Sequence, residues 1–260
     1  MRSYALISVF LPLVSSYLIA PLPEAIFSKP VAQDGFKIPT SYESAVMARR
    51  ILHLTPLATV STVFPPSKEA AVLERRPAEI AGMPIGLTEY TADCEGTGNP
   101  TLIAVKISTY YKNVVAGSNI SMSLQWLPPN PPSKRIELWG SDADVKPLPY
   151  SAANLPRFSL FGHLEKVSEE DAKASELGKC FTKVHPDAKY WLPGNDIHES
   201  EWARLVVEDI YFFGGFGDRS YIGWIPIEEW NKVTKEEWEE IRLPGEKKGW
   251  KEWTVEQLEL

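Results

Sequence analysis

The sequence predicts a mainly β protein of the α+β class, in which a closed or partly closed antiparallel barrel carries flanking helices. Short runs rich in β-branched and apolar residues recur along the middle of the chain. The connections between these runs are short, and no helix alternates with strands in the rhythm that parallel sheets require. The helical segments instead stand before, between and after groups of strands, as expected for helices that flank a barrel.

Composition limits the classes of function. Of the 260 residues, 44% are apolar and 23% charged, as in ordinary soluble globular proteins. A chain of this length can bury a core that is stable without disulfides or bound metals. The net charge is -7, and no block of Lys and Arg is free of interleaved acid. This charge balance argues against nucleic acid as a partner. Beyond the first residues, no segment is continuously apolar enough to span a membrane.

The first residues predict a signal peptide over 1–16, with cleavage as late as residue 20. Arg2 supplies a positive n-region, residues 5–14 an apolar core, and residues 14–16 a cleavage site of small residues. The apolar run is short and contains Pro12, so it does not predict a membrane span. We therefore expect a protein that is secreted or that resides in the endomembrane or vacuolar lumen. An uncleaved signal anchor is the alternative.

Two features agree with an oxidising lumen. Asn119 begins an Asn-Ile-Ser triplet, which is the glycosylation sequon of the chain. Cys94 and Cys180 are the two cysteines, and an oxidising compartment would let them form a disulfide. Cys94 lies in a Gly-rich loop and Cys180 at an apolar helix position. Sequence alone does not place their Cα atoms within bonding range, so two separate thiols are the alternative.

The elements can be followed along the chain. Residues 17–39 are proline-spaced and predict an extended arm. Thr40 to Glu43 form a capping box that opens a helix, and the alternating run 57–63 predicts a strand. Three further strands are predicted at 83–90, 101–108 and 121–126.

Residues 127–156 contain seven prolines, which predicts a rigid loop or lid inserted into a barrel domain of residues 40–233. Strands are predicted again at 157–167, 202–213 and 221–225. Between the first two, Ser168 caps one helix whose apolar stripe is Leu177, Cys180, Phe181 and Val184. Residues 234–260 predict a short capped helix followed by a charged tail.

One segment suggests a phosphate site. After the strand at 101–108, Ser108, Thr109 and Lys112 lie within one turn of each other at the start of a short helix. Hydroxyls, backbone N–H groups and an ammonium form a natural seat for a phosphate. The structural alternative is a capped helix with a solvated lysine.

In this order the segments resemble the flavin-binding split-barrel superfamily of pyridoxamine-phosphate-oxidase-like proteins, and more narrowly its CREG branch of secretory glycoproteins. The resemblance covers roughly residues 40 to 230, and Thr109 to Lys112 followed by Asn119 is its most telling part. The other segments that support it are 48–52, 57–62, 82–84, 158–162, 184–186 with Trp191, and 213–217.

The resemblance implies a six-stranded split barrel that pairs as a homodimer, with a groove at each subunit junction. In flavin-binding members that groove holds FMN. The FMN phosphate contacts family positions that correspond to Ser108, Thr109 and Lys112 in this sequence. The resemblance also implies that Thr59 and Ser61 line the same groove. The implied function is that of an FMN-dependent oxidoreductase of unknown substrate. No catalytic acid or base can be named.

Departures from the family pattern support two alternatives. Oxidase members carry additional basic residues on the first strand, where this chain has Thr59 and Ser61. CREG-type members are often unable to hold flavin because the chain itself blocks the groove, and residues 127–156 could block it here. The first alternative is therefore a non-enzymatic CREG-like glycoprotein that serves as a binding or signalling module.

The second alternative is a haem-binding split barrel, because Gly214 to Gly217 and His185 also resemble that branch. An axial ligand would have to come from a histidine. No histidine pair has metal-ligand spacing, so no metal site is predicted. The four histidines are His53, His163, His185 and His198.

Overall fold

The computed structural model describes residues 38–66, 76–132, 151–217 and 220–250. The predicted signal peptide, most of the predicted arm and residues 133–150 of the Pro-rich segment lie outside these residues. Among the described residues, no helix is both long and apolar enough to cross a membrane.

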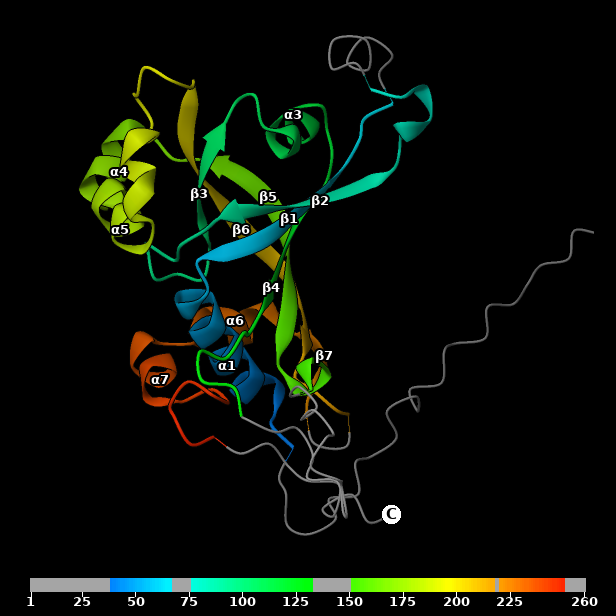
Figure 1. The fold of residues 1–260 in the computed structure, drawn as a ribbon, viewed down its shortest axis with the longest axis vertical. Coiled ribbons are helices and arrows are strands. Elements are labelled where there is room, and N and C mark those ends of the chain that lie inside the picture. Colours follow the sequence, from blue (N-terminus) through cyan, green and yellow to red (C-terminus); the bar gives the residue numbers. More distant parts are fainter. Residues whose placement is uncertain (1–37, 67–75, 133–150, 218–219, 251–260) are drawn as a thin grey trace, which may run out of the picture.

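A curled antiparallel sheet forms the centre of the molecule (Figure 1). Six strands follow one another in the order β2-β1-β4-β5-β6-β3, and β7 pairs with the free part of β6. The strands are β1 Leu57–Val63, β2 Pro84–Tyr90, β3 Thr101–Val105, β4 Ile120–Gln125, β5 Arg157–Lys166, β6 Ser200–Phe213 and β7 Ile222–Ile225. The predicted fold class, an α+β protein built on a six-stranded split barrel, is confirmed.

The two ends of the strand order return towards each other. Just beyond β2 and at the start of β3, Ala92 and Thr101 exchange two backbone hydrogen bonds, with N–H···O distances of 3.2 and 2.7 Å. Because β2 and β3 stand at opposite ends of the order, this bridge curls the sheet into a barrel that is closed at one corner and open elsewhere.

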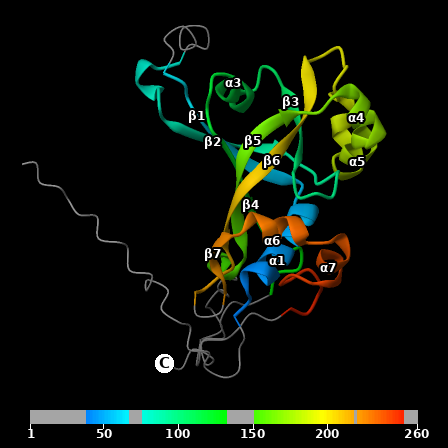
Figure 2. The same cartoon turned by 180° about the vertical axis from the view of Figure 1, so that it is seen from behind.

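Helices α1 (Ser41–Leu54), α6 (Ile227–Lys232) and α7 (Lys235–Glu240) pack together against the inner face at one end of the sheet (Figures 1 and 2). Both predicted capping boxes are present, at Thr40 for α1 and at Thr234 for α7. Helix α6 was not predicted, yet its Trp230 is fully buried in the main core. An aromatic side chain of this size buries a large apolar area and so contributes strongly to the stability of the core.

A second group of helices covers the side of the barrel near β3. It consists of α4 (Glu169–Ala174), α5 (Leu177–Val184) and the 3-10 turn η5 (Pro186–Tyr190). The single helix predicted here is wrong, because the chain breaks at Glu176, which takes a left-handed φ of 48°. An L-residue in this conformation ends the preceding helix and sets a new direction. Phe181 is buried as expected, whereas Val184 is 40% exposed.

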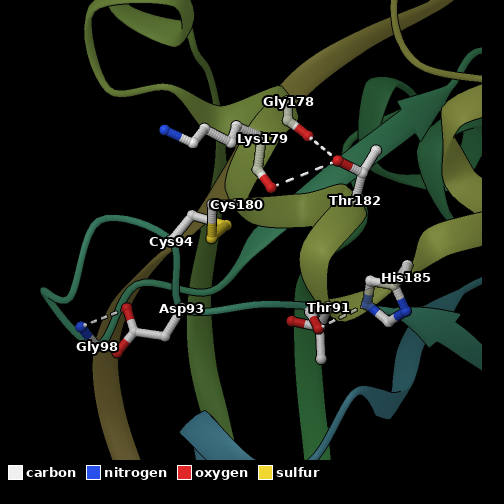
Figure 3. The surroundings of a disulfide bond; sticks show 9 residues. All are labelled: Thr91, Asp93, Cys94, Gly98, Gly178, Lys179, Cys180, Thr182 and His185. Carbon is white, nitrogen blue, oxygen red and sulfur yellow. Dashed lines mark hydrogen bonds between the residues drawn. A yellow bond between two sulfur atoms is a disulfide. The ribbon is translucent and has the colours of Figure 1, made fainter.

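A disulfide joins Cys94 to Cys180, with their Cα atoms 5.7 Å apart (Figure 3). It ties the loop between β2 and β3 to α5. Beside it, His185 Nε2 donates a hydrogen bond of 3.0 Å to the carbonyl oxygen of Thr91, which reinforces the same connection. Of the two states that the sequence left open for the cysteines, the structure has the pair.

Smaller elements complete the fold. The predicted strand 101–108 ends early at Val105, because Ser108 N–H donates to the Val105 carbonyl and turns the chain into α3 (Thr109–Val115). Two 3-10 turns, η3 (Ala78–Ile80) and η4 (Ala152–Asn154), precede β2 and β5. Part of the predicted charged tail packs as well, since Leu243 is 4% exposed.

Candidate functional site

A groove of about 740 Å³ lies on the outer face of the sheet, beside the end of α1. Its floor is a row of hydroxyl side chains that the strand register aligns across β2, β1, β4, β5 and β6. In that order the row is Thr88, Thr59, Ser123, Ser159 and Tyr211.

Strand alternation explains why these hydroxyls face outward. In β1, Ala58 and Val60 are 3% and 2% exposed and point into the core, while Thr59 between them is exposed. The same period of two places Ser123 and Ser159 on the outer face, where their Oγ atoms are 2.8 Å apart and share one hydrogen bond. Apart from Tyr211 at one end, the side chains of the row are small and leave the floor open to close approach.

The walls of the groove are apolar and aromatic. Leu57 and Leu127 are 44% and 64% exposed at its rim. Trp126 is buried behind them and donates its indole N–H to the carbonyl of Pro244 at 2.6 Å. Phe213 closes the far side. A polar floor between apolar walls is typical of sites for small organic ligands.

Arg157 is the one charged side chain among the described residues that line the groove. Its guanidinium carbon lies 3.9 Å from the centroid of the Phe213 ring. Nη1 donates long hydrogen bonds of 3.4 Å to the carbonyls of Ala153 and Leu155. Arg157 is not among the residues predicted from the sequence. The signal that could have pointed to it is its place at the head of a predicted strand whose alternate residues are polar.

The predicted residues of β1 fall on this outer face. Thr59 lines the groove, and Ser61 lies on the same face two residues further along. Ser61 pairs with Gly86 of β2 and Ser121 of β4, and it stands outside the groove lining.

The other predicted residues lie elsewhere. Ser108 is the N-cap of α3, Thr109 is its first residue and Lys112 lies in its last turn. This helix caps the opposite end of the barrel from α1, α6 and α7 (Figures 1 and 2). From α3, Asn113 Nδ2 donates to Thr62 Oγ1 at 3.0 Å, on the inner side of β1. Within one chain the structure therefore does not bring the five predicted residues into one groove, and their binding of a cofactor stays a prediction.

A polar cluster anchors α3 to β6 and β5. The Tyr111 hydroxyl donates to Glu201 Oε1 at 2.8 Å, and Lys166 Nζ lies 2.6 Å from Glu201 Oε2. Burial acts to raise the pKa of Glu201, but the hydrogen bonds from Lys166 and Tyr111 outweigh it and hold the pKa below its ordinary value.

We expect Glu201→Gln to remove part of the acid sensitivity of folding. A carboxylate with a depressed folded pKa stabilises the fold above its unfolded pKa, near 4.5, and this stabilisation is lost as the pH falls through the lower folded value. Urea denaturation at several pH values should show a smaller loss below pH 4.5 in the variant. Glu208→Gln is the control, because that exposed carboxylate pairs with His163 away from α3.

Among the described residues that line the groove there is no histidine, cysteine, lysine, aspartate or glutamate. Three histidines make contacts elsewhere: His185 is buried against Tyr90, the ring centroids of His53 and Trp238 are 4.3 Å apart, and His163 Nδ1 lies 2.9 Å from Glu208 Oε1. In the described part of the chain, no group of three or more His, Cys, Asp or Glu could hold a metal ion.

Several solved structures resemble this chain at low identity. The heme binding protein from Mycobacterium smegmatis matches with a TM-score of 0.50 and 16% identity, over 76% of this chain and 62% of its own. The FAD and heme binding protein of the same organism matches with a TM-score of 0.39 and 14% identity, over 73% and 82% of the two chains. A general stress protein 26-related protein of the pyridoxinephosphate oxidase family from Clostridium acetobutylicum has a TM-score of 0.42 and 9% identity, over 73% and 98%.

The match to the heme binding protein concerns the fold alone, and the chain spans less than two thirds of that protein. No curated protein matches the sequence. The family comparison is more specific, since the model described as "CREG, beta-barrel" matches residues 39–232. That range contains the whole sheet, α1 and α6. The chain belongs to the CREG β-barrel family.

Proposed function

We propose that this chain is a secretory-pathway split-barrel protein that binds FMN in the outer-face groove and acts as a flavin-dependent oxidoreductase of the pyridoxamine-phosphate-oxidase-like type. The observation that carries the proposal is the flat row of hydroxyls between apolar walls. A flavin has a planar, largely apolar ring with polar edge atoms, and such a floor and walls complement it.

The size and donor set of the groove fit this ligand. A volume of about 740 Å³ lies within the range of ordinary ligand sites. Ser123 and Ser159 share one hydrogen bond, so one of their two hydroxyl protons remains to be donated to a ligand. Thr59 and Thr88 add further hydroxyls in the same row. A bound flavin would supply the redox chemistry, while the protein would bind and orient it.

The same face supports a homodimer. Trp224 of β7 is 57% exposed beside Tyr211 and Phe161, with ring centroids 5.2 and 5.7 Å away. An exposed aromatic cluster next to a groove is a typical protein contact surface. Pairing through it would place a groove at each subunit junction. Light scattering should give the mass of a dimer, and Trp224→Asp should shift the protein towards the monomer.

A lumenal location fits two structural features. Structural disulfides form and persist mainly in oxidising compartments, and the sequon residue Asn119 is exposed just before β4. We therefore propose that the protein is a secreted or lumenal glycoprotein. Expression of the full chain in a eukaryotic secretory host should give a species whose mobility changes on deglycosylation, and Asn119→Gln should abolish that change.

The absorption spectrum of the purified protein tests the flavin proposal directly. We expect flavin bands in the blue and near ultraviolet after incubation with FMN and removal of excess ligand. Ser123→Tyr should fill the groove and weaken FMN binding roughly 10-fold or more. Ser121→Tyr is the matched control, because Ser121 lies on the same strand and face but outside the groove lining. A Soret band would instead support haem.

A non-enzymatic binding module is the second candidate. It is favoured by the lack of histidine, cysteine, lysine and carboxylate groups among the described lining residues, because most proton-transfer catalysis uses such groups. This candidate would be supported against the oxidoreductase if the purified protein is colourless and if neither it nor Ser123→Tyr binds added FMN.

A further inference from the structure

Arg157 is held in a defined orientation at the groove. It is the first residue of β5, and across the sheet it pairs with Gln125 of β4 and Phe213 of β6. The guanidinium lies 3.9 Å from the Phe213 ring centroid, a contact that steadies the planar group while leaving its donor edge accessible. Gln125 and Ser159, which also line the groove, place an amide and a hydroxyl nearby.

Two nitrogen atoms of the Arg157 guanidinium donate no hydrogen bond to any residue that the structure describes. Nη1 makes its two long hydrogen bonds to carbonyl oxygens, whereas Nε and Nη2 make none to the described residues, and neither atom is buried without a partner. Arg204 on β6 is different, because Glu95 and Glu165 lie 2.6 and 3.1 Å from its nitrogens. The Nε and Nη2 edge is the part of an arginine that binds oxyanions in a bidentate manner.

Among the residues that the structure describes, those lining the groove offer no counter-charge to Arg157. The protein as a whole carries a charge of -7, yet the described lining of the groove contains no carboxylate. A purely structural arginine, with its stem packed on Phe213, would explain the stacking alone. It would not explain why an acidic protein surrounds this cation with serine, threonine and glutamine, which are the neutral donors that complete an oxyanion site.

We infer that Arg157 is the anion anchor of the groove and binds the phosphate group of FMN. The inference rests on the proposed function and names the residue that would make the site selective for a phosphorylated flavin. The competing seat is the one predicted at Lys112, at the other end of the barrel.

FMN and riboflavin differ by the phosphate, so the pair isolates the role of the anchor. Quenching of flavin fluorescence should show that the native protein binds FMN more tightly than riboflavin. Arg157→Ala should weaken FMN binding roughly 10- to 100-fold and leave riboflavin binding unchanged. Arg204→Ala is the matched control, and it should alter neither. Thermal unfolding of each variant verifies that it is folded.

A second measurement does not depend on flavin. The Nε–H signal of Arg157, assigned by its loss in Arg157→Lys, should shift saturably in nuclear magnetic resonance spectra as inorganic phosphate is added. A phosphate-dependent shift without binding of either flavin would sustain the anchor and overturn the flavin proposal. Unchanged FMN binding in Arg157→Ala with no phosphate shift would overturn the anchor and sustain the flavin proposal. If Lys112→Ala abolishes FMN binding and Arg157→Ala does not, Arg157 is not the anion anchor.

Discussion

Replacing Cys94 and Cys180 together with serine is expected to lower the free energy of unfolding by about 4–5 kcal/mol. The disulfide closes a loop between residues 86 positions apart, and cross-linking so long a segment removes much of the entropy of the unfolded chain. The bond also connects α5 to the loop after β2, which carries Asp93. Guanidinium denaturation of the oxidised native protein and the double variant measures the difference.

Two controls separate the cross-link from local packing. Thr182→Val removes a hydrogen bond of 2.7 Å from Oγ1 to the carbonyl of Gly178, on the same helix, and should cost only about 1 kcal/mol. The reduced native protein should resemble the double variant. Equal stability of the oxidised protein and the double variant would contradict an entropic role for the disulfide.

The parts of the fold that depend on neighbouring residues could be predicted from the sequence. The capping box at Thr40 predicts the start of α1, because its hydrogen bonds run between residues three apart in the chain. The alternation from Leu57 to Val63 likewise matches β1. The break at Glu176 could not be predicted, since the left-handed conformation that separates α4 from α5 belongs to a residue that rarely adopts it.

The parts that depend on distant residues were out of reach. Arg49 and Arg50 of α1 are both buried, and each pairs with a carboxylate. The two carboxylates are 44 and 196 residues away in the sequence, so the pairing could not be predicted. Strand alternation predicts that Thr59 faces outward, but not that Ser123 and Ser159 align beside it. That alignment follows from the order of β1, β4 and β5 in the sheet, which no local pattern records.

The same reasoning explains the outcome for the candidate site. The cluster from Ser108 to Lys112 is local, so its place on a short helix that begins at Thr109 was predictable. The distance between this cluster and the groove depends on how the sheet curls between β3 and β1, which a local sequence pattern does not show. Arg157 had no neighbouring motif, and its relation to Phe213 comes from pairing between β5 and β6 across 56 positions of sequence (213 minus 157).

The second large effect should come from Arg49, which is 1% exposed. Its guanidinium donates to the Gly96 carbonyl at 2.6 Å, contacts Asp93 at 3.4 Å and lies over the Trp230 ring at 5.3 Å. Arg49→Met should lower the free energy of unfolding by about 3–5 kcal/mol, because Asp93 would remain buried without its counter-ion. Urea denaturation at neutral pH measures the loss.

A double variant and the pH dependence distinguish a stranded charge from lost packing. Arg49→Met combined with Asp93→Leu should recover most of the deficit, since two apolar side chains can replace a buried ion pair at little net cost. Burial raises the pKa of Asp93, against the opposing effect of Arg49. When the folded pKa of a carboxyl is raised, its charged form destabilises the fold at pH values above that folded pKa. Protonation at lower pH removes this electrostatic cost. The deficit of Arg49→Met alone should therefore shrink as the pH falls, and a deficit that stays constant with pH would assign the effect to lost packing around Trp230.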